Sequence, residues 1–500
     1  MAEFKTEDIS AYLKRQIASL EIKPIVYRCG RVSSVGDGVV RVEDLPDRLY
    51  GELLEFEGGV YGMAMDLTEN GVGAVLMNNG DTVNVGDKVK GTGVVAEVPV
   101  GEALLGRVID PIGRSLDGEP LVASEHLPVE RSAPAIMQRR PIDKPLETGI
   151  LAIDSMIPIG RGQRELIIGD RQTGKTSIAI DTVLNQKNSD VICIYCAIGQ
   201  KASNIAQIIN TLTVSGAIEY SVVVAATASD SPAMQYLAPY AACSVAEGFM
   251  EKGRDVLVIY DDLSKHAVAY RTMSLLLHRP PGREAFPGDV FYLHSRLLER
   301  SACMSMENGG GSITALPIIE TMGGNISAYI PTNVISITDG QIYLETELFH
   351  SGVRPAVNTG LSVSRVGRAA QHKAMQKVSG TLRIELSQFR EMAVFTRFGS
   401  DVDDSTKKML DRGRTLTELL KQPKGRPYSL FEQVALLTAY RSNAFDGIEE
   451  GRIKEFADGM LAFLHENCSV VEAAVKGSGD LSDENAERLI ESINNFKESF

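Results

Sequence analysis

The chain has 500 residues, of which 44% are hydrophobic and 6% aromatic, a composition typical of a globular protein with about two to four domains. Its formal net charge of −14 argues against a general polyanion binder, because nonspecific nucleic-acid binding depends on basic surfaces. No segment offers about 18 consecutive apolar residues and the start lacks a signal-peptide layout, so we expect a protein that stays in the cytoplasm or faces it.

Residues 1–25 contain a candidate helix. Its apolar residues recur at helical spacing and form one stripe: Ile9, Leu13, Ile17 and Leu20. Such a helix either packs on its own domain or docks a partner as a terminal arm, and the sequence leaves both interpretations open.

Residues 26–94 show short β-branched runs separated by Gly and Asp turns, which is typical of a small antiparallel β-barrel. The candidate strands are residues 30–35, 38–42, 73–77 and 86–89. Barrels of this kind can bind oligonucleotides. This one lacks interleaved basic and aromatic residues, so we expect a structural role.

Residues 95–370 alternate buried strands with helical stretches, which predicts a P-loop nucleotide-binding domain on a mostly parallel α/β sheet. The strand candidates are residues 165–168, 191–197, 221–226, 255–260 and 313–319. Residues 371–500 change to a helical period, with Leu382, Leu386 and Phe389 on one face, and predict an α-helical C-terminal domain.

The chain has 6 cysteines, and Cys193 and Cys196 form the closest pair. Both lie in the strand candidate 191–197, where positions three apart face opposite sides of a sheet. A disulfide or a shared metal does not fit this geometry, so we expect buried free thiols.

Eight residues fit the phosphate-loop pattern G-x-x-x-x-G-K-[ST]: Gly169, Asp170, Arg171, Gln172, Thr173, Gly174, Lys175 and Thr176. A strand candidate precedes them and a helix candidate follows at 177–184, so backbone N–H groups and a helix N-terminus would surround a phosphate. The pattern predicts a nucleoside triphosphate site. Lys175 would reach the β- and γ-phosphates, and the Thr176 hydroxyl would coordinate Mg²⁺.

Two further strand ends supply candidate site residues. The apolar strand 255–260 leads to Asp261, which we expect to hold Mg²⁺ through a water, and to Asp262, which could cap the next helix instead. Gln200 follows strand 191–197; a Gln can orient water but has no basicity at neutral pH, so it leaves hydrolysis undecided. On composition alone, Arg365 is typical of a surface ion-pair residue.

Several long segments resemble one family, the alpha subunits of F-type ATP synthases. They are residues 158–176, 260–267, 309–312, 328–341 and 362–367, and the resemblance covers essentially the whole chain in one register. It implies a barrel, a nucleotide-binding domain and a helical domain. It also implies an alternating alpha3-beta3 ring around the gamma shaft, with the N-terminal helix meeting the delta subunit of the peripheral stalk.

The resemblance also implies the chemistry. Such a complex couples proton or sodium flow to ATP synthesis from ADP and phosphate, as a peripheral assembly on the cytoplasmic face of the cell membrane. The alpha subunit holds Mg²⁺ with ATP or ADP and does not turn it over, because Gln200 stands where beta relatives carry the catalytic glutamate.

Three more residues take roles from the resemblance. Arg365 matches the arginine that alpha supplies in trans to the beta site, and Ser362 belongs to the same motif. Gln422 matches an adenine contact, whereas residues 424–428 depart from the family pattern and leave a second contact unassigned.

Two alternatives share the same core. A self-sufficient hexameric ATPase of the secretion type would require a carboxylate in place of Gln200. An RNA-translocating hexamer resembling a transcription terminator would require nucleic-acid contacts on the barrel, which the acidic charge and missing aromatic platforms disfavour.

Overall fold

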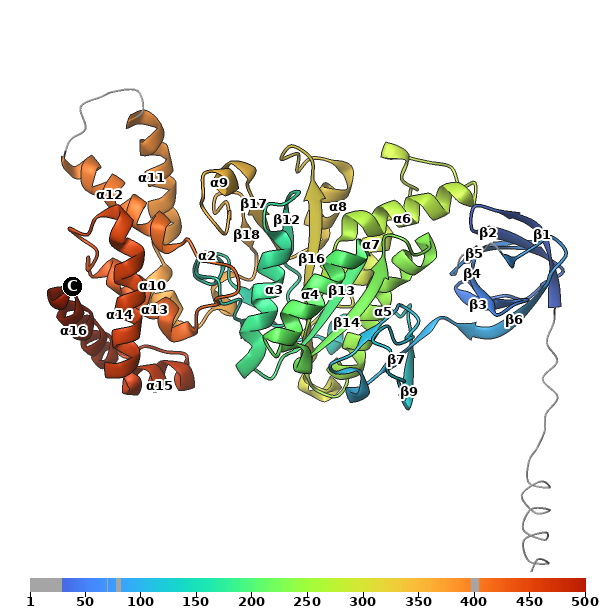
Figure 1. Ribbon diagram of the computed structural model, residues 1–500, viewed down its shortest axis with the longest axis horizontal. Coiled ribbons are helices and arrows are strands. Elements are labelled where there is room, and N and C mark those ends of the chain that lie inside the picture. The colour runs from blue at the N-terminus through green and yellow to red at the C-terminus, as the bar shows by residue number, and fades with distance from the viewer. Residues whose placement is uncertain (1–28, 70, 78–81, 397–403) are drawn as a thin grey trace, which may run out of the picture. The chain divides into compact units, whose positions relative to one another are not determined.

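The computed structural model describes residues 29–69, 71–77, 82–396 and 404–500 (Figure 1). The helix predicted within residues 1–25 lies outside them. The chain divides into two compact units: the first runs to Val94 without Met77–Asn79, and the second comprises that short segment and Val95–Phe500. None of the described helices is both long enough and apolar enough to cross a membrane.

The first unit is a closed β-barrel, as predicted. Alternation sets its inside: in β2, Val40 and Val42 are buried while Arg41 between them is exposed. The barrel order is β1-β2-β5-β4-β3-β6. The strands are β1 (Cys29–Gly36), β2 (Val39–Glu43), β3 (Glu52–Phe56), β4 (Val60–Thr68), β5 (Gly71–Leu76) and β6 (Lys88–Val95).

The second unit is built on an eight-stranded sheet of order β18-β17-β12-β16-β15-β13-β14-β8. Every neighbouring pair is parallel except β17 and β18 at one edge, which confirms the mostly parallel α/β fold. The strands are β8 (Val108–Ile109), β12 (Leu166–Asp170), β13 (Ile192–Gln200), β14 (Ser221–Thr227), β15 (Asp255–Asp261), β16 (Ser312–Thr321), β17 (Gly340–Leu344) and β18 (Val363–Ser364).

Helices cover both faces of this sheet. The chain moves one way along the sheet from β12 through β13 to β14, and then returns through β15 to β16. Because parallel crossovers are right-handed, the reversal puts the first connecting helices on one face and the later ones on the other. The helices are α3 (Lys175–Asn185), α4 (Ala202–Val214), α5 (Pro232–Met250), α6 (Leu263–Leu276), α7 (Val290–Leu298), α8 (Tyr329–Ile337) and α9 (Thr346–His350).

The central strands are apolar because both faces are covered. All residues of β13 and β15 are buried. Cys193 and Cys196 in β13 are buried free thiols, as predicted. Two short two-stranded sheets complete this region, formed by β7 (Glu97–Val100) with β9 (Glu125–Pro128) and by β10 (Pro145–Leu146) with β11 (Ile159–Gly160).

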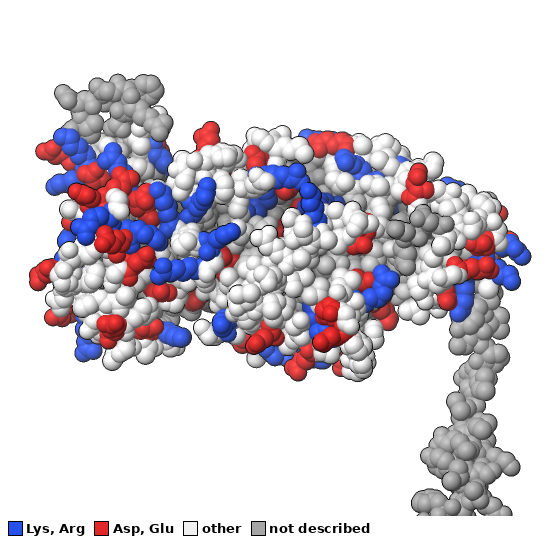
Figure 2. Space-filling view, in the orientation of Figure 1, with Lys and Arg blue, Asp and Glu red and all other residues white. Residues whose placement is uncertain are grey.

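The C-terminal region is helical, as predicted. Its helices are α10 (Lys373–Ser379), α11 (Leu382–Thr396), α12 (Asp404–Leu419), α13 (Leu430–Arg441), α14 (Ile453–Asn467), α15 (Ser469–Ser478) and α16 (Asp483–Ser499). On the face shown in Figure 2, the Lys and Arg side chains of this region interleave with Asp and Glu. Such mixing leaves no broad single-sign field on that face.

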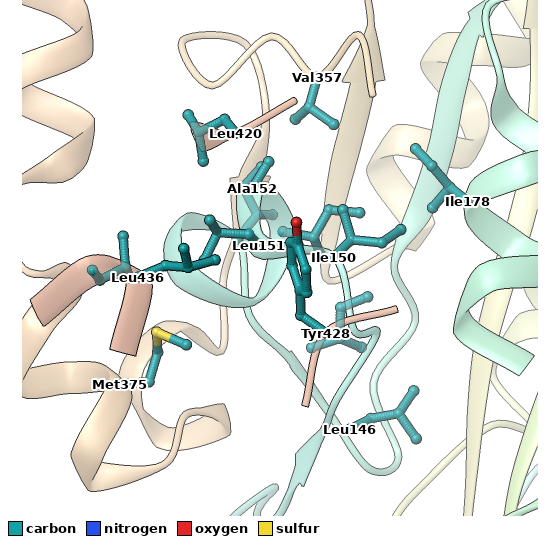
Figure 3. Close-up of a cluster of buried hydrophobic side chains, with 14 of the residues drawn as sticks. Leu146, Ile150, Leu151, Ala152, Ile178, Val357, Met375, Leu420, Tyr428 and Leu436 are labelled. Atoms are coloured by element: carbon teal, nitrogen blue, oxygen red, sulfur yellow. The ribbon is translucent and has the colours of Figure 1, made fainter. Parts of the chain in front are cut away.

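One hydrophobic cluster joins the sheet region to the C-terminal helices (Figure 3). The short helix α2 (Leu151–Met156) lies at its centre, and Leu151 is fully buried. Leu420, Tyr428 and Leu436 pack in the same cluster from the C-terminal side. The nucleotide-binding region and the C-terminal helices therefore share one core.

Candidate functional site

The phosphate loop connects β12 to α3, and its shape follows from its glycines. Gly174 is the N-cap of α3 and has a φ of 98°, a left-handed conformation that favours glycine. Helix α3 begins at Lys175, directly after it, so the first free N–H groups of the helix face the loop. This geometry suits an anionic phosphate.

Lys175 is held inside the loop. Its Nζ donates to the carbonyl oxygens of Gly169 at 2.9 Å and Asp170 at 2.6 Å, and 6% of the residue is exposed. Burial lowers the pKa of Lys175, while the carboxylates of Glu320 and Asp262 oppose that shift. The ammonium is thus positioned by backbone oxygens rather than by a paired side chain.

The Asp170 carboxylate connects the phosphate loop to neighbouring segments. It accepts hydrogen bonds from the Thr321 hydroxyl, the Gly324 N–H and the Thr346 hydroxyl. Burial alone would raise the pKa of Asp170, but these donors outweigh it and lower the pKa. Asp170 therefore ties the end of β12 to neighbouring elements.

Asp261 ends β15 beside the loop. Its Oδ2 accepts from the Thr176 hydroxyl at 2.9 Å and from the buried Tyr195 hydroxyl at 2.5 Å. The adjacent Asp262 is the N-cap of α6, accepting from the Lys265 N–H at 2.8 Å and pairing with Lys265 Nζ at 2.8 Å. The capping interpretation of Asp262 is therefore confirmed.

Gln200, expected to follow strand 191–197, is the last residue of β13 and lies at the carboxyl end of that strand. The register between β13 and β14 shifts between Ile198 and Gln200, where Gly199 has a φ of 59°. Such a bulge re-aims the next side chain. Gln200 Nε2 consequently donates to the Asp261 carbonyl oxygen at 3.0 Å.

These residues surround one cavity of about 900 Å³. Of the residues predicted from sequence, it is lined by Arg171, Gln172, Thr173, Gly174, Lys175, Thr176, Gln200, Asp261 and Gln422. Gly169 and Asp170 are not among the lining residues. A cavity of this volume is within the size range of small-molecule binding sites.

The far wall contains residues that the sequence analysis did not identify. Phe349, Arg354 and Pro355 line it, and the Arg354 guanidinium lies 4.4 Å from the centre of the Phe349 ring. Pro423 and Lys424 line the same wall. Phe349 lies in α9 and the other four residues lie in loops. Residues 349–355 and 423–424 are far apart in sequence, so no local pattern could reveal the wall that they form.

Gln422 links this wall to the phosphate-loop side. Its Nε2 donates to the carbonyl oxygens of Gly149 at 2.7 Å and Arg426 at 2.8 Å, and its Oε1 accepts from the Leu151 N–H at 3.1 Å. The amide therefore fixes the C-terminal segment against the start of α2 as well as lining the cavity.

Arg365 and Ser362 are not among the residues that line this cavity. Arg365 follows β18 at the sheet edge, is exposed, and donates its backbone N–H to the Asp339 carbonyl at 2.8 Å. Ser362 is fully buried; its hydroxyl accepts from the Tyr343 N–H and donates to the Asn358 carbonyl. Ser362 thus shapes the segment that carries Arg365.

The oxygen atoms of Thr176 and Asp261 fit Mg²⁺, which prefers hard oxygen ligands. Across the described residues, no group of three or more His, Cys, Asp or Glu side chains could hold a metal ion. A cation here would therefore share its coordination with phosphate oxygens and water, as Mg²⁺ does in phosphate-loop proteins.

Fold and site together define a P-loop nucleotide-binding protein with a barrel before the sheet and helices after it. Residues 25–93, 149–364 and 371–496 match the β-barrel, nucleotide-binding and C-terminal domains of the ATP synthase alpha/beta family. The chain belongs to that family.

Within the family, the similarity is to alpha subunits. The chain is 56% identical over 497 residues to the ATP synthase subunit alpha of Caldanaerobacter subterraneus subsp. tengcongensis, covering 99% of this chain and 98% of that protein. It is 57% identical over 500 residues to the subunit of the same name from Acetivibrio thermocellus, covering 100% and 99%. The resemblance found in the sequence is confirmed.

Proposed function

We propose that this chain is the noncatalytic alpha subunit of a rotary ATP synthase: it holds Mg²⁺ with ATP or ADP and supplies Arg365 to a neighbouring catalytic site. The noncatalytic assignment rests on the identity and position of Gln200. Its amide lies beside the phosphate loop, where hydrolysis would need a base, and donates to the Asp261 carbonyl. An amide orients water but cannot remove its proton at neutral pH.

The other acidic groups of the cavity support this proposal. Asp261 is engaged by Thr176 and Tyr195, and Asp262 by Lys265. Asp181 also lines the cavity, and its carboxylate accepts the Gly425 N–H at 2.8 Å. Glu320 also lines the cavity, and its carboxylate lies 3.8 Å from Arg171. Glu320 is therefore the carboxylate to remove if the site proves hydrolytic.

The proposed nucleotide pose follows the geometry of the cavity. Lys175 and the N-terminus of α3 would bind the phosphates, and Thr176 with Asp261 would hold Mg²⁺. The wall of Phe349, Arg354 and Gln422 would receive the base. Mg²⁺ would neutralise phosphate charge in this site.

The proposed role of Arg365 rests on its exposure at the edge of the sheet, away from the chain's own cavity. A guanidinium there can reach a neighbouring subunit and stabilise charge on a transferring phosphoryl group. The proposed neighbour is the beta subunit in an alpha3-beta3 ring around the gamma shaft, with the delta subunit at the peripheral stalk. The complex would lie on the cytoplasmic face of the membrane and couple proton or sodium flow to ATP synthesis.

The first experiment uses the purified chain alone. We expect it to bind MgATP and to hydrolyse it far more slowly than the about 1–1,000 per second that enzymes typically reach. The variant Lys175→Ala, which should bind weakly, is the control for site-specific binding. Rapid hydrolysis that Glu320→Gln abolishes would overturn the noncatalytic assignment.

The second experiment tests Arg365 in the assembled complex. Arg365→Lys should lower turnover by about 10³-fold, because Lys lacks the planar fork of donors, and should leave nucleotide binding to this chain intact. Arg368→Lys, at a neighbouring exposed arginine, is the matched control. Full turnover in Arg365→Lys would refute the trans role.

A further inference from the structure

Three consecutive residues directly before β12 are linked, directly or through one neighbour, to the segment that carries Arg365. They are Gln163, Arg164 and Glu165, and both Gln163 and Glu165 are fully buried. Their backbones are fixed as well: the Ala315 N–H donates to the Gln163 carbonyl, and the Glu165 N–H donates to the Ala315 carbonyl. The backbone of these three residues is therefore held in place by its hydrogen bonds to Ala315 of β16.

Gln163 reaches across β17 to β18, and Glu165 bonds to Gln163 and lies against Gly340 of β17. Leu166 pairs with Gln341, and Gly340 pairs with Ser364, so Glu165, Gly340 and Ser364 lie in line across three strands. Gly340 leaves room for the carboxyl, since a Cβ there would lie 2.4 Å from Glu165 Oε2. Gln163 Nε2 donates to Glu165 Oε2 at 2.7 Å and to Ser364 Oγ at 3.2 Å.

Arg164 holds the same segment by a second route. Its Nε and Nη2 donate to the two carboxylate oxygens of Asp339 at 3.0 and 2.9 Å, a bidentate pair. The Asp339 carbonyl oxygen accepts the backbone N–H of Arg365 at 2.8 Å. The first route, through Gln163, ends at Ser364, and the second, through Arg164 and Asp339, ends at the backbone of Arg365.

Burial of Glu165 disfavours the charged form of its carboxyl, although the hydrogen bond from Gln163 opposes this effect. Burial raises the pKa of Glu165 well above its usual range, and the Asp339 carboxylate adds to the rise, while Arg365 opposes it. Oε1 has no hydrogen-bond partner among the described residues. In its protonated form, Glu165 would not compete with phosphate for the Arg365 guanidinium.

We propose that Gln163, Arg164 and Glu165 form a clamp that positions Arg365, with Glu165 as a positioning residue for the reaction in the neighbouring subunit. This rests on the proposed trans role of Arg365. The clamp acts through hydrogen bonds and packing, so a neutral side chain of the same shape as Glu165 satisfies it.

The test measures ATP turnover of the assembled complex. Glu165→Ala should lower kcat by about ten- to a hundredfold with little change in KM, because small misplacements of a catalytic group are costly. Glu165→Gln keeps the shape and should retain kcat within about threefold. In an Arg365→Lys background, Glu165→Ala should cause no further loss, since coupled residues are non-additive.

Three outcomes would overturn the clamp. They are full turnover in Glu165→Ala, a loss of kcat in Glu165→Gln as large as that in Glu165→Ala, or the same fold-loss from Glu165→Ala with Arg365 present and in the Arg365→Lys background. If Glu165→Ala does not assemble, Gln163→Leu removes the bridging amide and carries the same expectations. Full turnover in Arg365→Lys would instead refute the trans arginine itself, so the two failures are distinguishable.

Discussion

A single carboxylate connects the phosphate loop to the central strands of the sheet. Asp261 Oδ2 accepts hydrogen bonds from two hydroxyls, those of Thr176 and Tyr195. Tyr195 is fully buried, so its hydroxyl has no water to replace Asp261. One oxygen thus binds the phosphate loop to the centre of the sheet.

We predict that Asp261→Asn weakens MgATP binding to this chain by about one to two orders of magnitude, the range of a lost charge-assisted hydrogen bond. Binding of ATP without Mg²⁺ should change much less. Titration of the purified chain with and without Mg²⁺ measures both. Tyr195→Phe removes one hydrogen-bond donor but keeps the carboxylate, so ATP binding by this variant should still depend on Mg²⁺. If ATP binding by Tyr195→Phe no longer depends on Mg²⁺, the assignment of Asp261 as the Mg²⁺ residue is contradicted.

The predictable part of the site is the part with a local pattern. Gly169–Thr176 has a fixed spacing, and Asp261 follows an apolar strand, so both could be found in the sequence. Tyr195 could not, because nothing in β13 distinguishes a tyrosine that contacts a neighbouring strand end from one that packs. Phe349 and Arg354 meet Gln422 only through the tertiary fold.

At the scale of elements, one histidine joins three helices of the C-terminal region. His465 in α14 lies 2.9 Å from Glu472 in α15 and 3.5 Å from Glu432 in α13. A hydrogen bond with Glu472, and the nearby Glu432, raise the pKa of His465. The charged imidazole therefore stabilises the packing of these helices.

The contribution of His465 to stability depends on pH. Since the pKa of His465 is higher in the folded state, its contribution is complete below about pH 6.5 and is lost as the pH rises through the folded-state pKa. His465→Gln should lower Tm by up to about 2 °C at pH 5.5 and have less effect at pH 8.5, as the pair is solvent-screened. His126→Gln, in β9, is the control; equal effects of His465→Gln at both pH values would contradict the prediction.

Strands with long apolar runs were predicted with nearly correct bounds, whereas two strands of the barrel were missed. The candidates 255–260 and 221–226 differ from β15 and β14 by one residue at most. In the barrel, β3 and β4 were missed, because Glu52 and Glu55 in β3 and Gly62 in β4 interrupt the pattern. β18 has two residues, and only its pairing with β17 makes it a strand.

At the scale of the whole chain, the second unit is held together by the cluster around α2. Leu436 in α13 is buried there with 1% exposure, alongside Ala152 and Leu420. Removing such a side chain costs the lost transfer free energy plus the cavity left behind. The C-terminal helices depend on this contact with the sheet region.

Leu436→Ala should therefore destabilise the chain by about 2–5 kcal/mol and lower Tm by at least about 4 °C. Calorimetry of the full chain measures the shift. Val470→Ala, at a position with 68% exposure in α15, should change the free energy of unfolding by less than about 0.5 kcal/mol. A Leu436→Ala protein as stable as the Val470→Ala control would show that the cluster does not join the two regions.

The hydrogen bonds of Gln422 have a consequence for how the chain can be divided. The family models place residues 149–364 and 371–496 in separate domains. The nucleotide cavity nevertheless takes part of its lining from Gln422, Pro423 and Lys424. A fragment ending at residue 370 would retain the phosphate loop but lose that side of the cavity, so we expect it to bind nucleotide more weakly than the full chain.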